Sequence, residues 1–168
     1  MFVNIYWIDS LAPGRIGIMA RPRGDDWLED EIRFLACNGV EVLGSLLTDS
    51  EIYELRLVDE GMYCAQQQIT YVPFPIRDRQ TPPLSEHTFT VMQELARLLE
   101  EQRTVVIHCR MGIGRAALVA ASVLALCGMS VEAAFNAIMT ARSCPVPDTR
   151  EQRAWVEQFD RQYRLNAV

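Results

Sequence analysis

The chain has 168 residues, 49% of them hydrophobic, and no linker or low-complexity stretch divides it, so we expect one domain over residues 1–168. Its formal net charge of −6 argues against a general nucleic-acid-binding protein, which needs a basic surface to displace counterions. The five cysteines lack paired spacings, which argues against a disulfide framework or a zinc site and favours a reducing, cytoplasmic location.

The first part of the chain predicts two strands and a helix. Val3 to Ile8 and Arg15 to Ala20 are rich in strand-forming residues, and Pro13-Gly14 between them indicates a turn, so the first strand would pair with the second at a sheet edge. Gly24-Asp25-Asp26 then predicts the N-cap of an amphipathic helix that ends at Asn38-Gly39. The N-terminus lacks the features of a signal peptide, and no apolar segment is long enough to span a bilayer, so we expect no membrane partner.

The middle of the chain alternates between strands and helices. Val40 to Leu47 is a second candidate for a buried strand, Ser50 is predicted to cap a short helix toward Leu57, and Glu60 to Gln67 is helical. Ile69 to Phe74 returns as a strand. Strands separated by helices need crossover connections, so we predict an α/β fold with a mainly parallel central sheet and helices on both faces.

A polar loop over residues 76–83 follows this strand, and Asp78 is its only carboxylate. Leu84 to Gln102 is then predicted as a long helix, with apolar residues spaced for one buried face. His87, near the start of that helix, is expected at the surface.

The most informative stretch is His108-Cys109-Arg110-Met111-Gly112-Ile113-Gly114-Arg115, which joins two apolar elements. Thr104 to Ile107 before it is a β-branched run typical of a strand buried on both faces, and Ala116 to Cys127 after it is an apolar helix that Gly128 would close. A glycine-containing turn at a helix N-terminus can wrap several free N–H groups around one oxyanion, and the same groups favour the thiolate of Cys109. Arg115 adds a planar fork of donors suited to two phosphate oxygens.

Two further helices complete the chain. Ser130 is predicted to cap a helix that runs to Ala141, and Asp148-Thr149-Arg150-Glu151 reads as a capping box for a terminal helix carrying Trp155.

The motif H-C-R-M-G-I-G-R-A resembles the signature of the cysteine-dependent protein phosphatases, most closely the small dual-specificity group that includes the cyclin-dependent-kinase-associated phosphatases. The resemblance extends over about residues 16–159. It implies hydrolysis of phosphotyrosine, with phosphoserine and phosphothreonine as further substrates, through a cysteinyl-phosphate and without metal or cofactor. The expected partner is therefore a phosphorylated protein.

The resemblance also assigns roles to single residues. Cys109 would be the nucleophile, and Asp78, about thirty residues earlier, would be the general acid that protonates the leaving oxygen. The loop amides and the Arg115 side chain would bind the phosphate, from residues Arg110, Met111, Gly112, Ile113, Gly114 and Arg115. His108 would support the loop, and Gln152 would orient the attacking water.

One position departs from the family pattern. Ala116 stands where the family usually has Ser or Thr, whose hydroxyl steadies the departing thiolate, so the second chemical step should be slow. This keeps open a catalytically weak phosphate-binding adaptor, and phosphoinositide or RNA 5′-phosphate hydrolysis is a further alternative. Rhodanese-like sulfur transfer does not account for Arg115 and Asp78 together. The remaining cysteines are expected to be buried spectators: Cys37, Cys64, Cys127 and Cys144.

Overall fold

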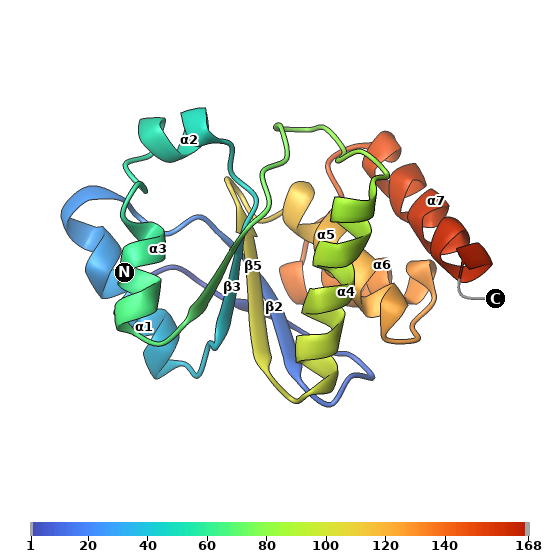
Figure 1. Ribbon diagram of the computed structural model, residues 1–168, viewed down its shortest axis with the longest axis horizontal. Helices are drawn as coiled ribbons and strands as arrows, with labels where there is room; N and C mark the ends of the chain where they lie inside the picture. Colours follow the sequence, from blue (N-terminus) through green and yellow to red (C-terminus); the bar gives the residue numbers. More distant parts are fainter. Residues whose placement is uncertain (1, 167–168) are drawn as a thin grey trace.

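A five-stranded sheet lies at the centre of the computed structural model, which describes residues 2–166 (Figure 1). The strand order is β1-β2-β5-β3-β4, with β1 antiparallel to β2 at one edge and all other pairs parallel. The strands are β1 (Tyr6–Ile8), β2 (Arg15–Ala20), β3 (Val42–Ser45), β4 (Thr70–Pro73) and β5 (Thr104–Cys109). The predicted mainly parallel sheet and its antiparallel edge pair are both confirmed.

Helices cover both faces of this sheet, as the sequence predicts. One layer contains α1 and α3, and the other contains α4, α5, α6 and α7 (Figure 1). Their bounds are α1 (Leu28–Cys37), α2 (Asp49–Glu54), α3 (Glu60–Gln66), α4 (Glu86–Glu100), α5 (Arg115–Leu126), α6 (Val131–Arg142) and α7 (Arg150–Asn166), and a 3-10 turn, η1 (Asp25–Trp27), precedes α1. Over residues 2–166, every helix is too short or too polar to span a bilayer.

The central strand and the helix after it form the most buried unit of the fold. Every residue of β5 is buried between β2 and β3, which suits its β-branched sequence. The helix α5 is buried almost all round, and it ends as predicted at Gly128, whose φ is +94°. The amide of Gly128 donates to the Ala125 carbonyl and the amide of Met129 to the Leu124 carbonyl, both at 3.1 Å, which is a Schellman motif. The strand-to-helix turn is thus flanked by two buried elements, β5 and α5.

The helix starts correct some of the predicted caps. Ser50 does not cap α2, because it already lies inside the helix. Thr48, which leaves the sheet with an extended backbone, accepts from the Glu51 amide and completes a capping box with the Glu51 side chain. The predicted cap at Gly24-Asp25-Asp26 is also wrong, because those residues enter a 3-10 turn and no side chain caps α1. The cap at Ser130 is confirmed by its bond from the Ala133 amide at 3.1 Å.

The capping box of the last helix lies one residue later than predicted. The Gln152 amide donates to Oγ1 of Thr149 at 3.1 Å, and Oε1 of Gln152 accepts from the Thr149 amide at 3.3 Å. The carboxylate of Asp148, the predicted cap, lies against Gly114 in the loop before α5. Gln152 therefore takes the place that the sequence assigned to Glu151.

Candidate active site

The nucleophile candidate Cys109 is the last residue of β5, and its thiol lies inside the turn that leads to α5. Its side chain is only 3% exposed, and its Sγ accepts a hydrogen bond from the Gly112 amide at 3.3 Å. Gly112 has φ +66°, and a Cβ at this position would collide with the Met19 carbonyl on β2. Only glycine fits both the backbone conformation and the close approach, so the turn has the cradle shape expected for an oxyanion loop.

Arg115, the first residue of α5, places its guanidinium beneath the same loop. The residue is 1% exposed, and Nη1 donates to the Ile76 carbonyl at 2.8 Å and to the Leu46 carbonyl at 3.4 Å. Both terminal nitrogens also bind the carboxylate of Glu51, at 2.7 and 2.8 Å. This bidentate pair fixes the plane of the guanidinium before any substrate arrives.

The charges of Arg115 and Glu51 stabilise each other. Burial by itself would raise the pKa of Glu51, but hydrogen bonds from Arg115 and Thr48 outweigh it and lower the pKa to about 2. Burial likewise opposes the charge of Arg115, while Glu51, the Cys109 thiolate and Asp78 raise the pKa of the guanidinium. The pair is therefore fully ionised at neutral pH.

Asp78 reaches the same guanidinium from the loop after β4. Its Oδ1 lies 3.3 Å from Nη2 of Arg115, and its side chain is 62% exposed at the mouth of the site. A cavity of about 650 Å³ opens beside it, and the charged residues of its lining are Asp49, Glu51, Arg77, Asp78 and Arg110. The structure thus brings Asp78 and Arg115 together with Cys109, while their catalytic roles stay predictions.

His108 is buried on the opposite side of β5 from the cradle. Its Nε2 lies 2.9 Å from Oε1 of Glu60, and the other oxygen of Glu60 accepts from the Tyr71 hydroxyl at 3.1 Å. Burial and the charge of Glu60 raise the pKa of Tyr71, and the same two causes raise the pKa of Cys64 to about 12. This buried network leaves Cys64 an unreactive thiol. The supporting role of His108 for the loop stays a prediction.

Two other expectations concern surface residues and the other cysteines. His87 is exposed, as predicted. Cys37 is exposed too, which corrects its assignment as a buried residue, while Cys127 and Cys144 are partly buried. Cys37 is the last residue of α1 and points away from the buried face of the helix, whose last buried residue is Leu35.

Gln152 is fully buried and lies next to the loop. Its Nε2 donates to the carbonyl of Gln80 at 3.3 Å, so it ties α7 to the loop that carries Asp78. A Cβ at Gly114 would lie 3.0 Å from Oε1 of Gln152. The side chain therefore lies at the rim of the cradle and also caps its own helix. Its water-orienting role stays a prediction.

The sequence-based analysis missed three partners of the loop. Glu51 pairs with Arg115, Glu60 approaches His108, and Arg142 donates to two loop carbonyls. The Thr48-x-x-Glu51 pattern could have predicted a capping box, in which the Glu51 side chain points back toward the N-terminus of its helix. No local signal marks Glu60 or Arg142, because both act across the fold.

Among residues 2–166, no group of three or more His, Cys, Asp and Glu side chains is arranged to hold a metal ion. The groups that the structure places at this site are a thiol, a buried guanidinium, loop amides and a carboxylate at the mouth.

A thiol centred in a cradle of amides, with a buried arginine six residues later, is the arrangement that defines the cysteine-dependent phosphatases as a class. Residues 17–129 match the model of the family described as "Tc-R-P: Polymorphic toxin system, DSP-PTPase phosphatase". The chain belongs to this family, and so to the superfamily of cysteine-dependent tyrosine and dual-specificity phosphatases.

The chain is also similar to one relative and to several solved structures. The chain is 26% identical over 134 residues to "Cyclin-dependent kinase inhibitor 3" of Rattus norvegicus; the match covers 79% of this chain and 63% of that relative, under two thirds of its length. A crystal structure of kinase associated phosphatase, with serine replacing the catalytic-site cysteine, has a TM-score of 0.87 at 23% identity and covers 100% of this chain and 98% of its own. PTPMT1 in complex with PI(5)P has a TM-score of 0.73 at 17% identity, with 96% and 99% covered. These structures share the fold.

Proposed function

We propose that the protein is a cysteine-dependent phosphatase that hydrolyses phosphotyrosine in proteins, with phosphoserine and phosphothreonine as further substrates. The observation that carries this proposal is the meeting of Cys109, Arg115 and Asp78 at one cradle. Asp78 comes from a different loop than Cys109 and Arg115. Together the three supply a nucleophile, an oxyanion clamp and an acid. Packing alone gives no reason for this combination.

In the first step, the Cys109 thiolate attacks phosphorus in line with the leaving oxygen. The S–P bond forms as the P–O bond breaks, and Asp78 gives its proton to the leaving alkoxide or phenoxide. The amides of residues 110–115 and the free edge of the Arg115 guanidinium bind the equatorial oxygens. Glu51 keeps that guanidinium in one plane, so little side-chain freedom is lost when the phosphate binds.

In the second step, water attacks the cysteinyl-phosphate, the S–P bond breaks, and inorganic phosphate leaves. Asp78, now ionised, takes a proton from the water, and Gln152 orients the water from the rim of the cradle. Ala116 is fully buried beneath the loop and offers no hydroxyl to the departing thiolate. Loss of one hydrogen bond to a charged group costs about 1.5–3 kcal/mol, so this step should be slower by roughly one to two orders of magnitude.

The charges at the mouth favour a protein monoester over a polyphosphorylated lipid or RNA end. Arg110 is already paired with Glu54 at 2.8 Å and lies 3.7 Å from Glu51. Three carboxylates face the same cavity as Arg77 and Arg110. A second phosphate would therefore meet more negative than positive charge, whereas one phosphate on a peptide would reach the cradle. The names of the rat relative and of kinase associated phosphatase agree with a phosphorylated protein as the partner.

The test is hydrolysis of aryl phosphates in reducing buffer by the native protein and by three variants. Cys109→Ser should abolish turnover. Asp78→Asn should lower kcat/KM, which reports the step that expels the leaving group, by about 10²–10⁴-fold, and by more for phenyl phosphate than for dinitrophenyl phosphate, whose leaving group needs no proton. Asp49→Asn, which removes another carboxylate of the same cavity, should leave kcat within a few-fold. Turnover that survives Cys109→Ser, or equal losses with both leaving groups in Asp78→Asn, would contradict the mechanism.

A phosphate-binding adaptor is the second candidate, and the buried Ala116 favours it. Such a protein would bind a phosphotyrosine peptide without turning it over, and Arg115→Ala would abolish the binding. Retention of Cys109 and Asp78 at the same cradle supports the enzyme instead, since a binding module needs neither.

A further inference from the structure

The end of helix α6 reaches back to the loop that holds Cys109. Arg142, the last residue of α6, donates from Nε to the Gly112 carbonyl at 3.0 Å and from Nη2 to the Met111 carbonyl at 3.0 Å. One planar guanidinium thus binds two consecutive carbonyls of the loop from its outer side. We propose that Arg142 is a positioning residue, which holds the oxyanion loop in the shape that binds phosphate. The inference rests on the proposed function of that loop.

The geometry of the peptide group explains how an outside contact acts on the inside of the loop. In a trans peptide the C=O and the N–H point in opposite directions. The Met111 carbonyl shares its peptide with the Gly112 amide, and the Gly112 carbonyl shares its peptide with the Ile113 amide. When Arg142 draws both carbonyls outward, both amides point into the cradle. The bond from the Gly112 amide to Sγ of Cys109, at 3.3 Å, shows this orientation for the first of them.

The loop has a particular need for such a contact. Gly112, with φ +66°, is conformationally permissive, and alternative peptide orientations cost a glycine little. The close approach of Gly112 to Met19 limits where the loop lies, but it provides no hydrogen bond to the Met111 and Gly112 carbonyls, which face away from the cradle. The guanidinium supplies that bond at both neighbouring peptides.

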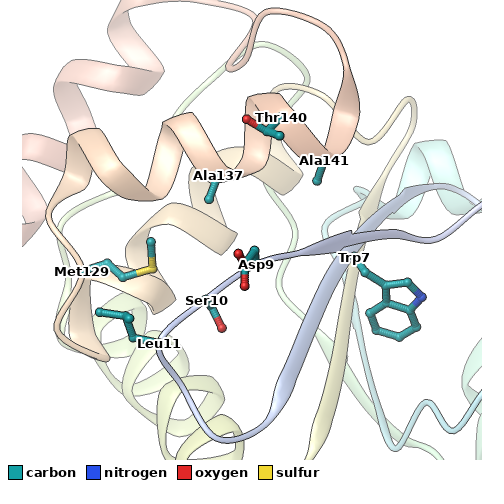
Figure 2. Close-up of a pocket in the computed structure, with 8 residues that line it drawn as sticks. All are labelled: Trp7, Asp9, Ser10, Leu11, Met129, Ala137, Thr140 and Ala141. Atoms are coloured by element: carbon teal, nitrogen blue, oxygen red, sulfur yellow. The ribbon is translucent and has the colours of Figure 1, made fainter.

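The position of Arg142 is in turn fixed by the edge strand. The Cζ atom of Arg142 lies 4.0 Å from the centroid of the Tyr6 ring on β1, a cation–π contact. Beyond this contact α6 and the chain after β1 separate around a cavity of about 390 Å³ (Figure 2). Figure 2 shows Ala137 and Ala141 pointing from α6 toward the segment at Asp9 and Ser10. Arg142 therefore links the end of α6 both to the sheet edge and to the loop.

The test measures the loop itself and does not depend on turnover. Amide hydrogen exchange, resolved by residue, should become at least about tenfold faster at Gly112 and Ile113 in Arg142→Ala, with the rest of β5 and α5 unchanged. Vanadate affinity and kcat/KM for an aryl phosphate should fall by about 10- to 100-fold, because misaligned donors lose most of their effect. Added methylguanidinium should restore part of the vanadate affinity and part of kcat/KM in Arg142→Ala. Arg142→Lys, which can reach one carbonyl but lacks the fork, should be intermediate.

Arg15→Ala is the matched control, since Arg15 stacks on Trp7, the neighbour of Tyr6, at 3.9 Å but has no hydrogen bond to the loop. It should leave exchange, vanadate affinity and kcat/KM within twofold of the native protein. Exchange at Gly112 and Ile113 that is the same in Arg142→Ala and native protein would overturn the proposal. If Arg142→Ala does not fold, exchange at Gly112 and Ile113 is compared between Arg142→Lys and the native protein instead, and equal exchange would again overturn the proposal. A native protein that binds vanadate but does not hydrolyse aryl phosphates would overturn the proposed function alone.

Discussion

The pair between Glu51 and Arg115 predicts that Glu51→Gln will destabilise the protein in a pH-dependent way. Glutamine keeps the size of the side chain, and it can still serve as the third residue of the capping box with Thr48. It removes the negative charge that both terminal nitrogens of Arg115 contact at 2.7 and 2.8 Å. The substitution therefore isolates the ion pair from the helix cap.

The magnitude follows from the pKa of the carboxyl group. A pKa lowered from 4.5 to about 2 corresponds to about 3 kcal/mol of preferential stabilisation of the charged form. Glu51 is 12% exposed, so solvent screening reduces this figure to about 2–3 kcal/mol. Breaking a buried pair leaves the partner's charge uncompensated, and here Asp78, at the exposed mouth, supplies only part of the missing charge. We expect Glu51→Gln to lose about 2–3 kcal/mol of unfolding free energy at pH 7.

Urea unfolding of the native protein and Glu51→Gln between pH 7 and pH 3 measures this effect. Because the pKa of Glu51 is lowered in the folded state, its contribution is fully present above about pH 4.5 and is lost as the pH falls toward 2. The difference between the two proteins should accordingly be constant from pH 7 to pH 5 and shrink below pH 4.5. In the same variant, a freer Arg115 should raise KM for an aryl phosphate.

The control is Glu54→Gln, which breaks the pair with Arg110 at a side chain that is 63% exposed. Exposed pairs contribute about 0–1 kcal/mol, so this variant should stay close to the native protein at every pH. The reasoning would be refuted if Glu51→Gln were as stable as the native protein at pH 7, or if its deficit did not change between pH 5 and pH 3.

Three further predictions concern the loop and its rim. Gly112→Ala should abolish turnover and cost about 2 kcal/mol or more in a denaturant titration, because φ is +66° and the new Cβ meets the Met19 carbonyl. Rapid mixing of the native protein with an aryl phosphate should give a burst of leaving group near one per enzyme, and Ala116→Ser should remove it; a linear native trace with fast turnover counts against this. Gln152→Ala removes the side-chain bonds to the Thr149 amide and the Gln80 carbonyl, so it should cost about 1–2 kcal/mol and slow phosphoenzyme hydrolysis in single-turnover experiments; an unchanged hydrolysis rate would show that Gln152 has only a structural role.

Local sequence determined the elements that present the reactive groups. A β-branched strand, a glycine-containing turn and an apolar helix follow one another without interruption, so the spacing from Cys109 to Arg115 is set by covalent connection alone. Gly128 and Ser130 end one helix and begin the next through hydrogen bonds that span at most five residues. Alternation of strands and helices then required a mainly parallel sheet, whose strand ends bring Asp78 to the same edge as Cys109.

Only the tertiary structure decided which charged side chains meet. Glu51 is 64 residues from Arg115 in sequence, and it becomes the partner of that arginine because β3 and β5 are neighbours and α2 turns back over their ends. Arg142 and Glu60 reach the loop region in the same non-local way. An acidic or basic residue on a helix has no periodic signal that distinguishes a buried partner from a solvated surface charge. The pairing depends on the sheet order and helix packing, which bring distant segments within hydrogen-bond distance.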